Sequence, residues 1–132
     1  MSTYLFITNP QYTPERVEEG FDVPWWSCSS TSQLGDHALV YVTGVGIQYE
    51  WCITSDAKRN GKWKYICDVE HFRTFDPPIE LKDIMEVVNK EEWKPPYLHF
   101  RGYRSIAVPD NIAQRIRSLR PEQSKADRRI LS

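Results

Sequence analysis

The spacing of apolar and polar residues predicts a chain of short strands joined by tight turns. Runs of β-branched and aromatic residues predict strands over residues 3–8, 37–43, 47–55 and 62–72, with shorter ones over 97–100 and 105–108. Asn60-Gly61 is typical of a hairpin turn, and Asp76-Pro77-Pro78 predicts a break after the fourth strand. In that fourth strand the buried set is either Trp63, Tyr65, Cys67 and Val69 or the face of Ile66, and the pattern leaves both open.

Apolar residues at helical spacing predict helices over residues 79–88 and 109–119, and Thr13-Pro14 predicts the start of a short helix that Gly20 ends. Residues 121–132 are polar and basic, without a period, and are typical of a tail. Strands this short, joined by turns, favour an α+β fold. We expect a mixed β pseudo-barrel of about five or six strands, flanked by two or three helices.

Trp25 and Trp26 stand side by side before a run of small polar residues that begins with Ser27. Neighbours on an extended chain point to opposite faces, so one indole can lie in a core while the other faces a cleft. Proteins hold a single planar base by stacking it on an aromatic face and adding a few hydrogen bonds. The segment is therefore a candidate half of a base-binding cage. The alternative is that both indoles belong to the core.

Length and composition indicate one domain over residues 1–120, because 132 residues with 40% hydrophobic and 13% aromatic content can bury a core. The charge is uneven along the chain. Residues 1–100 hold nine Lys/Arg and fifteen Asp/Glu, a balance of −6, whereas residues 101–132 hold eight and three, a balance of +5. The basic end is either a phosphate-binding surface or a solvated helix.

Several classes of protein find no support in the sequence. No apolar run is long enough for a membrane span and no signal peptide is recognisable, so we expect a cytoplasmic protein that binds no membrane. The three cysteines are far apart and suit reduced thiols, with no spacing that suggests zinc. His37, His71 and His99 stand isolated from any nucleophile or metal ligand in the sequence. We therefore expect no enzyme, metal or cofactor.

The ordered set of segments resembles the EVE domain, a member of the PUA-like group that also holds the YTH readers of methylated adenine in RNA. The matching segments are Tyr4-Leu5-Phe6-Ile7-Thr8-Asn9, Val23-Pro24-Trp25-Trp26-Ser27, Gly35-Asp36, the strand from Trp63 to Val69, and Phe100-Arg101-Gly102-Tyr103-Arg104-Ser105. The resemblance covers nearly the whole chain. It implies a PUA-like pseudo-barrel with a pocket for a flipped, modified base.

The resemblance also assigns residues to that pocket. Trp26-Ser27 matches the Trp-Ser pair beside the pocket of the related readers, with Trp25 adjoining it, and Thr8 and Asn9 match the polar end of the first strand. Arg101 and Arg104 match a basic loop that contacts the nucleic-acid backbone, to which we add Arg115. Trp51 and Trp63 either line the pocket or belong to the core. Pro10 stands where YTH readers have a polar residue, so specificity for methyladenine does not carry over.

Three functions follow as hypotheses. The first is a non-catalytic, monomeric reader of a modified base in DNA or RNA, which acts alone or with a partner nuclease or other effector. The second is a module that binds a small molecule or nucleotide in the same cavity. The third is a structural adaptor whose aromatic residues are all core.

Overall fold

A single curled sheet is the centre of the fold, seen here in a computed structural model that describes residues 1–8, 25–61, 64–88, 93 and 104–120. The strands in these ranges are β1 (Thr3–Thr8), β2 (Trp25–Ser27), β3 (His37–Val42), β4 (Gly46–Ile53), β5 (Lys58–Asn60), β6 (Lys64–Ile79) and β7 (Arg104–Val108). The helices are α2 (Leu81–Val87) and α3 (Asp110–Ser118).

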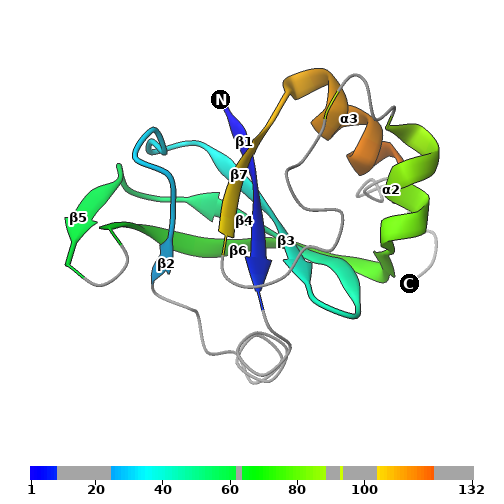
Figure 1. The fold of residues 1–132 in the computed structure, drawn as a ribbon, viewed down its shortest axis with the longest axis horizontal. Helices are drawn as coiled ribbons and strands as arrows, with labels where there is room; N and C mark the ends of the chain where they lie inside the picture. Colours follow the sequence, from blue (N-terminus) through cyan, green and yellow to red (C-terminus); the bar gives the residue numbers. More distant parts are fainter. Residues whose placement is uncertain (9–24, 62–63, 89–92, 94–103, 121–132) are drawn as a thin grey trace, which may run out of the picture.

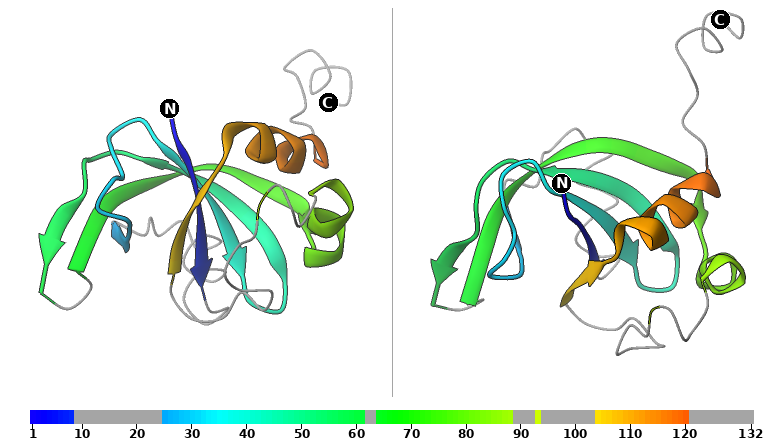
Figure 2. Two further views of the ribbon diagram at one scale, coloured as in Figure 1. Left: turned by 45° about the horizontal axis from the view of Figure 1, so that its top comes forward. Right: turned by 90° about the horizontal axis from the view of Figure 1, so that it is seen from above.

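The strand order is β2-β6-β4-β3-β1-β7, and β5 pairs with β6 beside this path. β1 runs parallel to β3 and antiparallel to β7, and the other pairs are antiparallel (Figure 1). The sheet bends into an open half-barrel, with α2 and α3 together at one end of it (Figure 2). The α+β fold predicted from the sequence, with a mixed sheet and flanking helices, is thereby confirmed.

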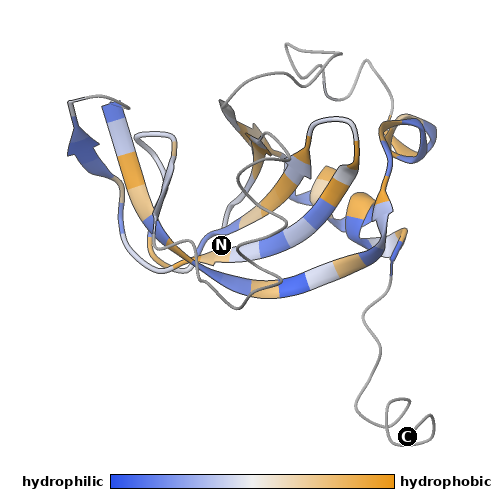
Figure 3. Ribbon diagram, turned by 90° about the horizontal axis from the view of Figure 1, so that it is seen from below, coloured by the Kyte–Doolittle hydropathy of each residue, from blue (hydrophilic) through white to orange (hydrophobic). Residues whose placement is uncertain are grey.

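Alternation along the strands divides the core between the two faces of the sheet, and the hydropathy of the strands changes from residue to residue in Figure 3. The first cluster lies on the face that α2 and α3 cover. It includes Leu5, Ile7, Leu39, Tyr41, Ile47, Ile84, Ile112 and Ile116. The second cluster lies on the other face and includes Tyr4, Phe6, Val40, Tyr49, Trp51, Cys67 and Val69, with Trp26 and Cys28 packed against it.

Most predicted elements agree with the structure to within a few residues, and the hairpin at Asn60-Gly61 joins β5 to β6. The expected break at Asp76-Pro77-Pro78 is wrong, because β6 continues to Ile79 and α2 begins only at Leu81. The register explains how the prolines fit. Pairing between β4 and β6 jumps from Tyr49↔Thr74 to Ile47↔Ile79, so Pro77 and Pro78 lie in an irregular stretch between paired residues. Proline fits there because its missing backbone N–H is not required for a hydrogen bond between the strands.

Gly46, the first residue of β4, is required by close packing against the end of β6. Its φ is +127°, and a Cβ atom there would collide with the backbone carbonyl of Ile79. Gly44 also has a positive φ, of +83°, but has open space where its Cβ would lie. Only a residue without a side chain fits at Gly46 without moving one of the two strands.

The expected helix over 14–20, the expected strand over 97–100 and the tail over 121–132 lie outside the described residues. Within the described part of the chain, neither helix has the length and apolar character needed to span a bilayer.

Candidate functional site

Trp25, Trp26 and Ser27 form the edge strand β2, which pairs antiparallel with β6 through Trp25↔Asp68, Trp26↔Cys67 and Ser27↔Ile66. The extended backbone turns the two indoles to opposite faces. Trp25 points away from the core and is 42% exposed. Trp26 packs against the second cluster while its side chain stays partly accessible. The indole placed between core and surface is therefore that of Trp26.

Trp51 forms the wall behind Trp26. The two ring centroids lie 5.5 Å apart at an interplanar angle of 71°, and Trp51 meets Phe6 in a second edge-to-face contact at 6.4 Å. Trp51 is only 2% exposed. Of the two roles left open for Trp51, the structure thus places it in the core, where it supports the ring of Trp26 rather than facing solvent.

Two buried hydroxyls lie on the same face of the sheet as Trp26. Thr8 follows Phe6 at a spacing of two along β1, and Ser105 of β7 lies directly opposite Phe6, so both side chains point to the face of the second cluster. Neither Thr8 Oγ1 nor Ser105 Oγ has a hydrogen-bond partner among the described residues. A buried, unsatisfied hydroxyl costs roughly 1–3 kcal/mol, so such groups commonly mark a site that a ligand or water completes.

The loop after β2 is held by its own polar residues. Thr31 Oγ1 lies 2.9 Å from Tyr4 Oη and 2.9 Å from Ser29 Oγ, which fixes the loop to β1. The Cys28 backbone N–H donates to the Tyr65 carbonyl at 3.0 Å and extends the pairing with β6 by one residue. The backbone that follows Trp26 is therefore anchored on both sides.

Two thiols lie beside Trp26 on this face. A hydrogen bond with Cys67 lowers the pKa of the partly buried Cys28 thiol, and that same hydrogen bond, together with burial, raises the pKa of Cys67. Cys28, Cys52 and Cys67 are all free thiols, as the sequence predicted. Cys28 is therefore the more acidic of the pair.

Several predicted site residues lie outside the described residues: Asn9 and Trp63 of the base pocket, and Arg101 of the phosphate-binding set. Arg104 is described only as the first residue of β7. Arg115 Nη1 donates to the Val87 carbonyl at 3.3 Å, so its guanidinium joins α3 to α2.

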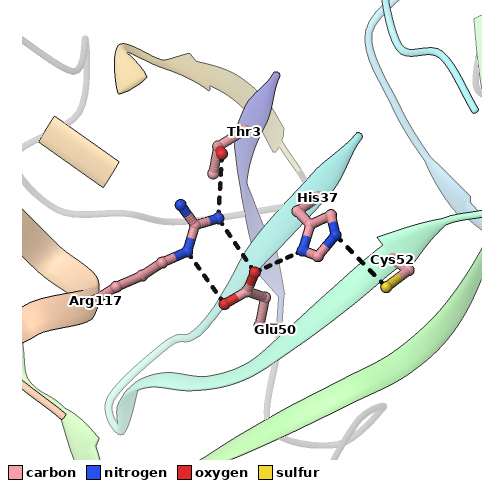
Figure 4. Close-up of polar contacts among 5 residues, drawn as sticks. All are labelled: Thr3, His37, Glu50, Cys52 and Arg117. Carbon is pink, nitrogen blue, oxygen red and sulfur yellow. Dashed lines mark hydrogen bonds and ion pairs between the residues drawn. The ribbon is translucent and has the colours of Figure 1, made fainter. Parts of the chain in front are cut away.

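A polar cluster that the sequence reading missed lies on the opposite face, beside the first cluster (Figure 4). His37 and Cys52 face each other across β3 and β4, and Glu50 lies two residues before Cys52 on the same face. His37 Nδ1 is 2.6 Å from Glu50 Oε2, and Cys52 Sγ is 3.7 Å from His37 Nε2. The expectation that His37 stands isolated is thus wrong, because strand pairing brings it to both residues.

Arg117 of α3 completes this cluster. Its Nη2 donates to Glu50 Oε2 at 3.1 Å and to Thr3 Oγ1 at 3.1 Å, and its Nε donates to Glu50 Oε1 at 3.3 Å. Glu50 is 2% exposed, so the guanidinium neutralises a buried carboxylate. The signal in the sequence was a glutamate in the middle of a largely apolar strand, which requires a partner when the strand is buried.

Within the described residues, no group of three or more His, Cys, Asp or Glu side chains is placed to hold a metal ion.

Several proteins of known structure have a similar fold. A search with protein-family models gave no match, and a search of curated proteins gave none either. A crystal structure of a protein from Pseudomonas putida superposes with a TM-score of 0.70 at 16% identity, over 90% of this chain and 99% of that chain. A crystal structure from Pseudomonas syringae gives 0.69 at 14% identity, over 90% of this chain and 99% of that one. An NMR structure from Rhodopseudomonas palustris gives 0.69 at 12% identity, over 91% of this chain and 93% of that one. At these identities the likeness establishes a shared fold and leaves function to the residues of the site.

Proposed function

We propose that this protein is a nucleic-acid-binding module that takes a flipped, modified base against the indole of Trp26, without chemistry at that pocket. The proposal rests on the resemblance to the EVE domain and on one structural observation. Trp26, a partly exposed residue, shares its face of the sheet with the buried hydroxyls of Thr8 and Ser105, which have no hydrogen-bond partner among the described residues. A planar base needs this combination, because stacking supplies affinity and a few directed hydrogen bonds supply selectivity.

The energies of such binding are compatible with a single indole wall. Extruding a base costs a few kcal/mol, and one base–aromatic stack returns roughly 1–3 kcal/mol. Each hydroxyl that gains a partner adds about 0.5–1.5 kcal/mol. A modified base that is already unstacked or in a single strand therefore binds most readily.

The experiment measures, by calorimetry, how tightly the protein binds short single-stranded DNA and RNA oligonucleotides that carry one modified base or none. We expect Trp26→Ala to abolish the preference for the modified base and to leave weak, salt-sensitive binding. Phe72→Ala is the matched control, since Phe72 is 48% exposed and packs against His37 in the cluster on the other face. If Trp26→Ala keeps the preference, the assignment of the pocket is wrong.

Thr8→Val separates a ligand-binding hydroxyl from a structural one. Valine has the shape of threonine without the hydroxyl, so the unliganded variant should be at least as stable as the wild type, because a buried unsatisfied group is removed. Affinity for the modified base should fall, by about tenfold for a loss of 1.4 kcal/mol. Unchanged affinity would show that Thr8 does not contact the ligand.

A nucleoside or nucleotide as the ligand is the second candidate, and one observation favours it. The described arginines in α3 and just beyond it are held by internal partners: Arg115 by Val87, Arg117 by Glu50, and Arg120 by the Pro77 carbonyl at 2.9 Å. These side chains offer little charge to a polymer. The double change of Arg101 and Arg104 to Glu should weaken nucleic-acid binding and leave nucleoside binding unchanged. Tryptophan fluorescence that responds to neither ligand would favour a structural adaptor.

A further inference from the structure

We propose that Cys52 is a nucleophilic thiol, that His37 is its general base, and that the substrate class is a small uncharged or cationic acyl ester or thioester. This site lies on the face of the sheet opposite Trp26 and does not depend on the proposed function. It rests on the relay from Cys52 through His37 to Glu50 shown in Figure 4.

The hydrogen bonds set the tautomer of the imidazole. A carboxylate only accepts hydrogen bonds, so His37 Nδ1 donates to Glu50 Oε2 at 2.6 Å. In the neutral ring this leaves Nε2 as an acceptor, directed to Cys52 Sγ at 3.7 Å. A nucleophile beside a base that a third group orients is the arrangement used in nucleophilic catalysis, and such distances are looser before substrate binds.

Glu50 is a positioning residue whose own orientation is fixed from α3. Arg117 donates to both carboxylate oxygens, and Thr3 accepts a further bond from the same guanidinium. The carboxylate is 2% exposed and cannot turn toward water. The imidazole is therefore held in one tautomer and one orientation by elements from three parts of the chain.

Charge and apolar surface around the thiol indicate the substrate class. Burial, then Glu50 and Glu70, raise the pKa of the Cys52 thiol, so little thiolate forms unaided and attack requires the base to remove the thiol proton. The charge of Glu50 is paired with Arg117, whereas the exposed carboxylate of Glu70 disfavours an anionic substrate. Phe72 lies edge-on to His37 at 4.9 Å and is 48% exposed, which provides an apolar wall for an acyl group.

The reaction balances without a cofactor. Cys52 Sγ forms a bond to the acyl carbon while His37 Nε2 takes the thiol proton and passes it to the departing alcohol or thiol. The products are an S-acyl cysteine and that alcohol or thiol. Water then cleaves the S-acyl bond to release the acid and restore the thiol.

The test uses p-nitrophenyl acetate and measures acetylation at each cysteine by peptide mass spectrometry. Cys28 is the internal control, because it is partly exposed and packs against the cluster on the other face. We expect His37→Gln to lower the Cys52 rate about 100-fold relative to Cys28, the lower end of the usual contribution of a general base. A fall of less than tenfold, or a folded wild-type protein that neither acetylates Cys52 nor releases p-nitrophenol faster than Cys52→Ser does, would overturn the proposal.

Wild-type protein provides a second test that does not depend on how a variant folds. Transfer of the thiol proton to His37 during attack makes acetylation of Cys52 slower in D₂O than in H₂O. Cys28 reacts as a thiolate, since its pKa is lowered, and shows no such slowing beyond its change in ionisation. An equal solvent effect at both cysteines would overturn the role of His37. Glu50→Gln should reduce the solvent effect at Cys52 if Glu50 orients the base.

Discussion

Replacing Arg117 with Met should destabilise the protein strongly, because it leaves the buried carboxylate of Glu50 without its cation. Arg117 makes two charged hydrogen bonds to Glu50, which is 2% exposed, and one bond to Thr3. Removing one partner of a buried ion pair costs about 3–5 kcal/mol. For a chain of 132 residues that loss corresponds to a fall in Tm of roughly 11–18 °C. It is also a large fraction of the roughly 5–15 kcal/mol that stabilises a typical domain.

Urea unfolding followed by tryptophan fluorescence measures this loss. The matched control is Lys58→Met, which breaks an ion pair of 3.0 Å with Asp68 in which both side chains are about half exposed. That change should cost at most about 1 kcal/mol. The double variant of Arg117→Met with Glu50→Leu removes both charges and should be at least about 2 kcal/mol more stable than Arg117→Met alone. If Arg117→Met costs no more than Lys58→Met, Glu50 does not depend on its cation and the reasoning fails.

Three further predictions concern packing and thiol chemistry. Gly46→Ala should lower the free energy of unfolding by about 1–3 kcal/mol and by more than Gly44→Ala, because a Cβ has room at Gly44 and none at Gly46. Equal losses for the two variants in urea titrations would contradict this. Trp51→Ala should cost about 3–5 kcal/mol as a core truncation, and a loss below 1 kcal/mol in the same titration would place Trp51 outside the core. Iodoacetamide below pH 9 should alkylate Cys28 long before Cys67, because the lowered pKa of Cys28 gives more thiolate at a given pH and the raised pKa of Cys67 gives less. Peptide mass spectrometry that finds Cys67 modified first would refute this prediction.

The fold was largely predictable because its strands carry strong local signals. Residues 3–8 and 37–43 are runs rich in β-branched, aromatic and other apolar residues, and they form β1 and β3. The end of β6 was not predictable from the same rules. Proline normally ends a strand, but Pro77 and Pro78 fall where the pairing of β6 with β4 skips residues, and that skip depends on tertiary pairing.

The candidate sites were likewise predictable only in part. The opposite orientation of Trp25 and Trp26 follows from strand geometry and was predictable. The contact of His37 with Cys52 was not, because it requires the register of β3 on β4, and that register shifts by one residue between Val40 and Tyr41. A local pattern holds no information on such a shift. Counting residue pairs outward from the turn at Gly44, without the shift, places His37 opposite Trp51, one residue from its actual partner Cys52.

The place of β1 in the sheet has a consequence for how the protein is made. β1 lies between β3 and β7, and Arg117 bonds to Thr3 across 114 positions of sequence. One edge of β1 therefore stays unpaired until β7 has been synthesised, and the Thr3 bond forms only once Arg117 has followed, 114 positions later. Contacts of such long range slow folding, so the half-built sheet exposes the edge of β1 during synthesis. Expression at low temperature or with a holding chaperone should consequently raise the yield of soluble protein more than strengthening any local element would.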